Sequence, residues 1–281
     1  MRSEHARSAT DGLIESNNSQ LRLNLHWNST EKLGARGDRL SCAPGGDTEL
    51  STCVTCPHRE TGFCAAAFRS PSLETEISAG EQKFLAFSPG KQIIVQGGSL
   101  DRVFVICAGW AFRYIQLSDG TRQILKFLMP GDPLSPISIF EEAAHFSVKS
   151  LTSVQLYGFS RAAIHETCFS DRELQSEIAR SCVSDAQDNA RLAVVLGRRS
   201  AEEKIAYLFM HLIERIATSQ VIRAGRYPFP LRQQHIADAV GLTPVHVNRV
   251  LSDFRTRAVL MLSGGTLEIF DYPELERMAS L

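Results

Sequence analysis

The 281-residue chain has no apolar run long enough to cross a membrane, and its N-terminus lacks the charged-then-apolar pattern of a secretory leader. We therefore expect a cytoplasmic protein. Neither sign of charge is in excess, with 30 Lys and Arg against 31 Asp and Glu, so the bulk charge does not identify a partner. The seven cysteines are expected to be thiols or metal ligands, because disulfides are rare in a reducing compartment.

A cluster of histidines and carboxylates is also missing from residues 84–159, where His145 has only Glu141 and Glu142 near it. An enzyme of the cupin type needs such a cluster, on alternating positions of its strands, to hold a metal. We therefore expect that the chain is not an enzyme. The hydrophobic content of 43% is enough to give each of two domains its own core.

Four successive regions are predicted along the chain. Residues 1–40 are rich in Ser, Asn, Arg and Gly and are expected to form a disordered tail. Residues 41–170 contain cysteines and then turn signals at roughly ten-residue spacing, which is typical of a β-barrel or jelly roll. Residues 171–197 repeat apolar positions every three or four residues, which predicts one long helix, and residues 198–281 follow as a separate domain.

The strongest local signal predicts two helices joined by a tight turn within residues 231–254. Ala237 lies four positions before Gly241, so a small side chain lets the helices approach while the glycine adopts a left-handed backbone. Thr243 is expected to cap the second helix, with Pro244 at its first position. This arrangement is a helix-turn-helix.

Two short apolar runs, 258–262 and 266–270, follow the second helix and are separated by Ser263-Gly264-Gly265. They predict a β-hairpin, so the motif is expected to be a winged helix-turn-helix. Arginines outnumber carboxylates between Arg215 and Arg257, and such a local excess favours contact with phosphate.

The second helix has one apolar stripe, and its other sides carry the residues predicted to contact DNA. Arg249 can donate two hydrogen bonds to guanine, Asn248 can pair with adenine, and Val245 can touch a thymine methyl group. The full predicted set is Thr243, Val245, His246, Asn248, Arg249 and Ser252. A double-stranded DNA operator is therefore the expected partner.

The order of barrel, long helix and winged helix-turn-helix, with the segment GLTPVHVNRVL, strongly resembles the Crp/Fnr family of transcription regulators from about Cys53 to Phe270. The resemblance implies an α+β fold with an N-terminal β-roll sensor domain of the jelly-roll, cyclic-nucleotide-binding type. It also implies a homodimer that reads an inverted-repeat operator and acts, as an activator, on RNA polymerase. The dimer contact is assigned to Leu174, Ile178, Cys182 and Ala186 on the long helix.

Members of the FNR-like branch read their half-site with a Glu, a Ser and an Arg. The matching positions here hold Val245, Asn248 and Arg249, so only the arginine is kept and an altered half-site is expected. Cys53, Cys56 and Cys64 resemble the N-terminal cysteines by which this branch holds a [4Fe–4S] cluster. The resemblance thus implies a regulator that responds to oxygen or redox state.

In that branch a barrel strand supplies the fourth cluster ligand, and the matching residue here is Tyr157 or its neighbour Leu156, neither of them an ordinary ligand. Cys42, Cys107 or a carboxylate such as Asp132 can replace it. Other uses of the cysteines stay open, namely structural zinc bound by Cys42, Cys53, Cys56 and Cys64 or thiol redox sensing without a metal. Two further alternatives stay open. One is a regulator without an effector, and the other is a regulator that binds a cyclic nucleotide, with Lys149 as a weak phosphate contact.

Overall fold

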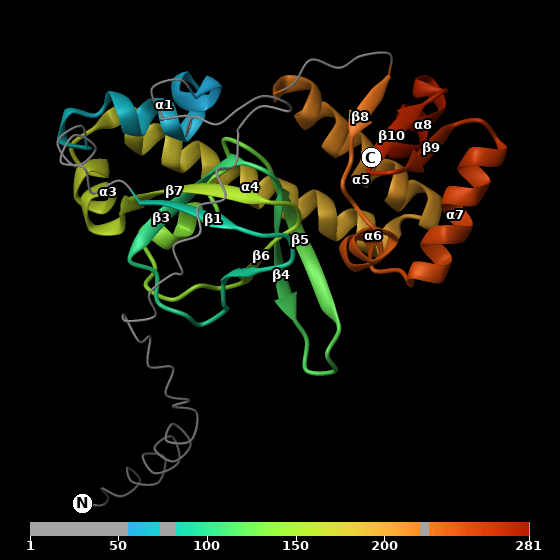
Figure 1. Cartoon of the computed structure of the whole chain (residues 1–281), viewed down its shortest axis with the longest axis horizontal. Coiled ribbons are helices and arrows are strands. Elements are labelled where there is room, and N and C mark those ends of the chain that lie inside the picture. The colour runs from blue at the N-terminus through green and yellow to red at the C-terminus, as the bar shows by residue number, and fades with distance from the viewer. Residues whose placement is uncertain (1–55, 74–82, 220–224, 281) are drawn as a thin grey trace, which may run out of the picture. The chain divides into compact units, whose positions relative to one another are not determined.

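The computed structural model describes residues 56–73, 83–219 and 225–280, and Figure 1 shows their arrangement. The described residues form an antiparallel β-roll, one long helix, and a C-terminal part of helices with a small sheet. The α+β fold expected from the sequence is therefore confirmed. The predicted tail at residues 1–40 lies outside the described residues.

The β-roll consists of two antiparallel sheets with the strand orders β1-β7-β3 and β2-β6-β4-β5. Its strands are β1 (Lys83–Phe87), β2 (Gln92–Ile94), β3 (Arg102–Ala108), β4 (Ala111–Gln116), β5 (Arg122–Leu128), β6 (Ser147–Ser150) and β7 (Val154–Ser160). The β4–β5 hairpin turns at Asp119-Gly120. There Gly120 has a φ of +86°, and Asp119 accepts a hydrogen bond of 2.9 Å from the backbone N–H of Thr121.

Gly109, between β3 and β4, cannot be replaced by a residue with a side chain without moving the backbone. Its φ is +82°, and a Cβ atom there would lie 1.9 Å from the carbonyl oxygen of Ser153. The next residue, Trp110, is held by a hydrogen bond of 2.9 Å from its N–H to Oγ1 of Thr152. The glycine therefore lets the β3–β4 turn approach the start of β7.

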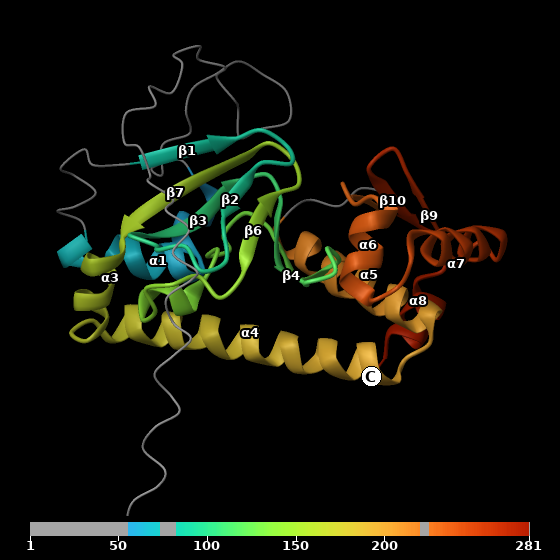
Figure 2. The same ribbon diagram turned by 90° about the horizontal axis from the view of Figure 1, so that it is seen from below.

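The long helix α4 (Arg172–Arg198) runs without interruption beside the β-roll, and Figure 2 shows it continuing towards α5. It is preceded by η1 (Pro57–Glu60), α1 (Gly62–Arg69), η2 (Pro136–Ile139) and α3 (Arg161–Cys168). Asp171 caps it by accepting hydrogen bonds of 3.0 and 3.1 Å from two backbone N–H groups of its first turn. The single long helix predicted from the apolar repeat is therefore present.

The side of α4 that faces the β-roll is not the side assigned to the dimer contact. Leu174 and Ile178 are buried, and they pack in one cluster with Phe63 of α1 and Phe159 of β7. Because these two side chains are already covered within one chain, they cannot face a second copy, which corrects the prediction for both positions. Cys182 lies at the edge of the same cluster, and Ala186 is exposed.

The C-terminal part begins with α5 (Ala201–Ser219). The elements after α5 are β8 (Arg226–Pro228), α6 (Gln233–Val240), α7 (Pro244–Thr256), β9 (Leu260–Ser263), β10 (Thr266–Ile269) and α8 (Tyr272–Ala279). Three later helices and one later strand, namely α6, α7, α8 and β8, pack against α5. Ser200 and Glu203 form a capping box at the start of α5, with hydrogen bonds of 2.8 and 3.3 Å. The hairpin β9–β10 is also present, and β8 adds a third strand that the sequence pattern did not predict.

The core of the C-terminal part continues into the β-roll. Trp110 of the roll packs on Phe229 at 6.4 Å between ring centroids, and Phe229 in turn packs on Phe209 of α5 at 4.9 Å. These residues belong to one buried cluster that also includes Phe112 and Phe254. None of the helices in the described residues has the length and apolar character that a membrane span requires.

Candidate nucleic-acid interface

The turn between α6 and α7 has the geometry that its sequence predicts. Gly241 ends α6 with a φ of +65° and a ψ of +40°, and the backbone N–H of Leu242 donates to the carbonyl of Ala237 at 3.1 Å. Oγ1 of Thr243 accepts a hydrogen bond of 3.2 Å from the N–H of His246, which caps α7. These contacts lie within a few residues of one another and define the turn between the two helices.

The side chains of α7 separate into a buried and an exposed face. Val247, Val250 and Phe254 are buried against α5 and α6. All six residues predicted to contact DNA are exposed: Thr243, Val245, His246, Asn248, Arg249 and Ser252. Val245 is 81% exposed, which is unusual for an apolar side chain without a partner. The exposed face is therefore available to a major groove.

Asn248 makes a contact that the sequence did not suggest. Its Oδ1 accepts a hydrogen bond of 3.0 Å from Nε2 of Gln233, the first residue of α6. Pairing with adenine uses the amide oxygen and nitrogen together, so Gln233 must turn away before Asn248 can read this base. Gln233 is itself exposed at the start of α6, and we add it to the candidate interface.

The arginines of the C-terminal part do not all point towards DNA. Arg226 pairs with Glu268 across the small sheet at 3.2 Å. Arg257 pairs with carboxylates of α5, α7 and α8 at 2.9 to 3.0 Å. Arg215 pairs with Asp132 of the β-roll. Within the described residues this leaves Arg232, Arg249 and Arg255 exposed and without a carboxylate partner, while Arg223 lies outside them.

The β4–β5 hairpin of the roll contacts α6 through an ion pair, a hydrogen bond and an aromatic pair. Nε of Arg122 lies 2.5 Å from Oδ2 of Asp238, and Nε2 of Gln123 donates to the carbonyl of Ala239 at 2.9 Å. The ring of His235 packs on Phe112 at 5.6 Å between centroids. Burial, together with nearby Arg122, lowers the pKa of His235 to about 4, so this ring is neutral at pH 7.

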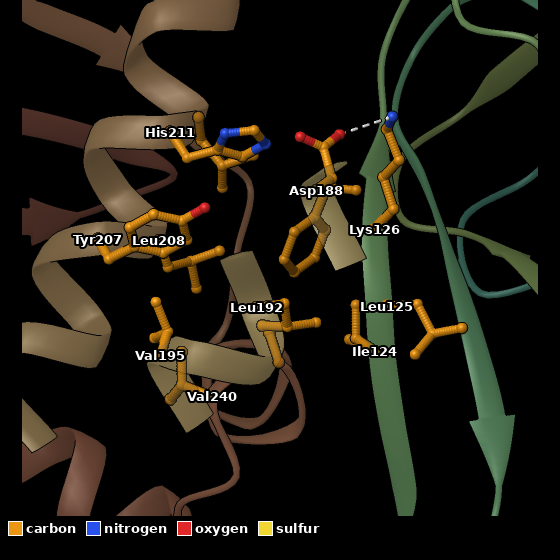
Figure 3. Close-up of a pocket in the computed structure, with 13 residues that line it drawn as sticks. Ile124, Leu125, Lys126, Asp188, Leu192, Val195, Tyr207, Leu208, His211 and Val240 are labelled. Carbon is orange, nitrogen blue, oxygen red and sulfur yellow. Dashed lines mark hydrogen bonds and ion pairs between the residues drawn. The ribbon is translucent and has the colours of Figure 1, made fainter. Parts of the chain in front are cut away.

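A small, mainly apolar cavity lies where β5, α4, α5 and α6 meet (Figure 3). Tyr207 and His211 of α5 lie on one side of it, with Asp188 of α4 and Lys126 of β5 opposite. Burial lowers the pKa of His211, so its ring is neutral at pH 7. Side chains from the β-roll, the long helix and the C-terminal part therefore line this one cavity together.

A network of buried ion pairs joins the β-roll to α4. Asp185 of α4 lies 2.5 Å from Nη1 of Arg113 and 2.6 Å from Nζ of Lys126, which also contacts Asp188 at 3.0 Å. Arg113 further donates to the carbonyl of Leu134 at 2.6 Å. Two cations thus balance two carboxylates at the face of the roll that covers α4.

The cysteine segment, here residues 56–64, brings thiols to α1 and to the residue before η1. Cys56 is half-buried, whereas Cys64 is buried in α1 beside the aromatic cluster that contains Phe63 and Phe159. Cys107 of β3 lies at the edge of the same cluster. Cys42 and Cys53 lie outside the described residues, and within the described ranges no three His, Cys, Asp or Glu side chains are grouped for a metal.

The strand position that the family resemblance assigns to a fourth cluster ligand is occupied by aromatic packing. Tyr157 is 4% exposed, and its ring lies 4.7 to 5.7 Å from those of Phe68, Phe84 and Phe159. Thiolates are suitable ligands for iron, so Cys56 and Cys64 fit an Fe–S centre chemically, but Tyr157 does not complete the set. Asp132 is engaged by Arg215, Cys42 lies outside the described residues, and the assignment of Cys42 or Cys107 as a ligand stays a prediction.

Comparison with known proteins agrees with this architecture. Residues 84–171 match the cyclic nucleotide-binding domain, and residues 203–278 match the Crp-like helix-turn-helix domain. The chain is 30% identical to the nitrogen fixation regulation protein FixK of Rhizobium meliloti (strain 1021), over 71% of this chain and 90% of FixK. It is 24% identical to the transcriptional activator protein FnrL of Cereibacter sphaeroides, over 77% and 87% of the two chains.

The solved structure of FixK2 from Bradyrhizobium japonicum has the same fold, with a TM-score of 0.65 at 21% identity over 71% of this chain and 98% of FixK2. These relatives are transcription regulators rather than enzymes. The exposed face of α7 and the two domain matches lead to the same conclusion. This chain belongs to the Crp/Fnr family of DNA-binding transcription regulators.

Proposed function

We propose that the chain binds an inverted-repeat operator as a homodimer, and that an Fe–S centre held by Cys53, Cys56 and Cys64 makes this binding respond to oxygen or redox state. The observation that carries the proposal is the packing of α1, which holds Cys64, directly on α4. A dimer formed through α4 would present two α7 helices to the two halves of an operator. Acting as an activator on RNA polymerase is part of the same proposal, supported by the likeness to FnrL.

The exposed side of α4 supports pairing with a second copy. Small apolar residues recur there in alternating steps of four and three, which is the spacing of a coiled-coil contact. We call this row the seam, and it consists of Ala179, Val183, Ala186, Ala190, Ala193 and Gly197. Val183 is 55% exposed within one chain, so the seam has apolar surface left for a partner. It replaces the inward-facing Leu174 and Ile178 as the proposed contact.

Replacing Ala186 with glutamate is expected to raise the dissociation constant of the homodimer at least about tenfold, because two like charges would meet across the seam. Sedimentation velocity over a range of protein concentrations measures this constant. The matched control is Ala162→Glu, which adds the same charge to an exposed alanine of α3. Equal association of the two variants would exclude the seam as the dimer contact.

The cysteine segment and α4 share one buried cluster, so a change at the thiols can reach the helix. Cys64 and Phe63 of α1 pack with Leu174 and Ile178 of α4. An ion pair of 2.8 Å between Arg69 and Glu173 adds a surface contact, which contributes little because both side chains are more than half exposed. Bound at Cys56 and Cys64, a cluster would therefore fix the position of α1 against the first turns of α4.

Protein purified without oxygen is expected to be brown, with about four iron per chain, and to bleach in air. The measurement is a visible spectrum with iron, sulfide and zinc analysis. Cys56→Ser and Cys64→Ser should each lose iron, whereas Cys168→Ser, in α3, should keep it. One zinc per chain would make the cysteine site structural, and a metal-free protein would exclude the Fe–S proposal.

A regulator without an effector is the second candidate, and the buried ion network favours it. Asp185 already holds Arg113 and Lys126 against α4 within the chain itself. The β-roll is thereby joined to the long helix without any bound molecule. Operator binding that is equal for anaerobic, air-exposed and cysteine-to-serine protein would support this candidate over the Fe–S regulator.

A further inference from the structure

We propose that the turn at Gly131–Asp132 links the cysteine segment to the C-terminal part within a single chain. In this arrangement a movement at Cys56 reaches α5 through His58, Asp132 and Arg215, independently of the seam between two copies. A regulatory role for this link rests on the proposed response of the cysteines to oxygen or redox state. The mechanical connection between the cysteine segment and α5 does not depend on that response. Contacts on both sides of the turn carry the inference.

The first contact joins the cysteine segment to the turn. A Cβ atom at Gly131 would lie 3.1 Å from Nδ1 of His58, so the imidazole ring lies directly against the backbone of the glycine. Gly131 has a φ of +94°, a conformation that residues with side chains rarely adopt. His58 is two residues from Cys56, and the N–H of Arg59 donates to the carbonyl of Cys56 at 3.1 Å, so the histidine and the cysteine move together.

The second contact joins the turn to α5. Asp132 forms an ion pair with Arg215 and accepts a hydrogen bond of 2.8 Å from the N–H of Met129. Arg215 also donates from Nη1 to the carbonyl of Phe127 at 2.8 Å. One guanidinium group therefore holds both the end of β5 and the turn that follows it, and it is only 22% exposed.

The turn itself is tied to the roll and cannot deform freely. The N–H of Gly131 donates to the carbonyl of Ile106 at 2.8 Å, and the N–H of Ile106 donates to the carbonyl of Asp132 at 3.0 Å. A displacement of His58 is therefore passed on through the turn rather than absorbed in it. Contiguous hydrogen bonds and ion pairs between rigid elements are a physical route for coupling.

A shift of α5 has a direct consequence for α7. Phe209 and Ile216 of α5 belong to the same buried cluster as Val247 and Phe254 of α7, and the two helices pack together. Since packed interiors transmit displacement instead of compressing, a movement at Arg215 changes where the exposed face of α7 lies. The link thus joins the cysteine segment of each chain to its own recognition helix.

Hydrogen exchange of the full chain, followed by mass spectrometry, tests the link without any assumption about a metal. His58→Ala is expected to raise exchange severalfold both in residues 127–132 and in the half of α5 that contains Arg215. In Arg215→Met that half of α5 should exchange faster already, and adding His58→Ala should change it no further. Faster exchange confined to residues 127–132 in His58→Ala, or unchanged exchange in both places, would overturn the proposal.

Arg161→Met is the matched control, because Arg161 resembles Arg215 in its surroundings. Its side chain is 24% exposed, donates to the carbonyl of Ser138 at 3.1 Å and lies 3.9 Å from Glu142. This variant should leave exchange in α5 unchanged, and an effect equal to that of Arg215→Met would overturn the link. Arg215→Lys keeps the charge that pairs with Asp132 and should restore part of the protection.

Operator affinity then separates the link from the proposed oxygen response. The ratio of the dissociation constants for air-exposed and anaerobic protein is measured for the wild type and for Arg215→Met. If the wild-type ratio differs from one by more than threefold, the ratio for Arg215→Met should be at least threefold closer to one. A wild-type ratio of one would reject the oxygen response alone, while the exchange experiment would still decide the link.

Discussion

Replacing Asp185 with alanine is expected to lower the free energy of unfolding by about 3–5 kcal/mol, because it breaks a buried ion pair from one side. The carboxylate lies between Arg113, whose side chain is 7% exposed, and Lys126, at 14%. Without it, Lys126 would keep Asp188, and Arg113 would have no carboxylate partner among the described residues. Chemical denaturation at one fixed protein concentration, followed by circular dichroism, measures the loss.

The loss of stability in Asp185→Ala is compared with the loss at an exposed carboxylate. Asp101 is exposed on the loop before β3, and Asp101→Ala should change the free energy of unfolding by less than about 0.5 kcal/mol. If Asp185→Ala cost no more than this control, the network would not hold the β-roll to α4. Asp185→Asn should lie between the two, because the amide keeps an acceptor but loses the charge.

The stability that Asp185 contributes should also depend on pH. Burial raises the pKa of Asp185, but the charges of Arg113 and Lys126 outweigh it and hold the pKa below its ordinary value. A group whose pKa is depressed in the folded state stabilises the protein above its unfolded pKa, and this contribution is lost as the pH falls through the folded pKa. The difference between wild type and Asp185→Asn should therefore be full at pH 7 and shrink in acid.

The helix-turn-helix could be predicted from the sequence because its determinants are local. The left-handed backbone of Gly241 and the cap of Thr243 act within a few residues, and the stripe of Val247 and Val250 follows from the helical period. The turn of the β4–β5 hairpin at Asp119-Gly120 is likewise local, because Asp119 accepts a hydrogen bond from the N–H of Thr121. Where one short stretch of chain contains all the partners of an interaction, the sequence pattern of that stretch is enough to predict the local structure.

The orientation of α4 could not be predicted in the same way, since both sides of this helix carry apolar residues. Leu174 and Ile178 face inward only because α1 and β7 cover them, and nothing in the helical repeat indicates this. The alanines of the seam are smaller and gave a weaker signal than the leucine and isoleucine. The dimer contact was therefore assigned partly to residues of the protein's own core.

The roles of the arginines depended on partners that are remote in sequence. Arg215 is paired with Asp132, 83 residues away, although its position suggested a phosphate contact. Arg257 is likewise paired with Glu202, 55 residues away, and with Glu274. A count of basic residues along the chain does not reveal such pairs, so the excess of arginine overstated the surface that is available to DNA.

Replacing Arg249 with alanine is expected to raise the dissociation constant for the operator by about 5- to 150-fold, equivalent to about 1–3 kcal/mol. Its guanidinium group is exposed on α7 between Asn248 and the buried Val250, and no carboxylate of the described residues pairs with it. It can therefore donate two hydrogen bonds to the acceptors of one guanine in the major groove. The loss should be confined to operators that carry this guanine.

The measurement is fluorescence anisotropy with an operator selected by the wild-type protein from a random pool, and with copies changed at single base pairs. At the base pair that Arg249 reads, the variant should bind the selected and the changed operator equally well. If it still discriminated there as the wild type does, Arg249 would not read a base. The salt concentration must be the same throughout, because phosphate contacts make every affinity depend on it.

Arg257→Ala provides the matched control, since it removes the same side chain only eight positions further along. Arg257 joins α5, α7 and α8 through ion pairs with Glu202, Asp253 and Glu274. Its hydrogen bonds to Asp253 and Glu202 raise its pKa. This variant should lower stability while keeping the wild-type preference at every base pair of the operator. Loss of preference in Arg249→Ala but not in Arg257→Ala would assign base reading to the exposed face of α7.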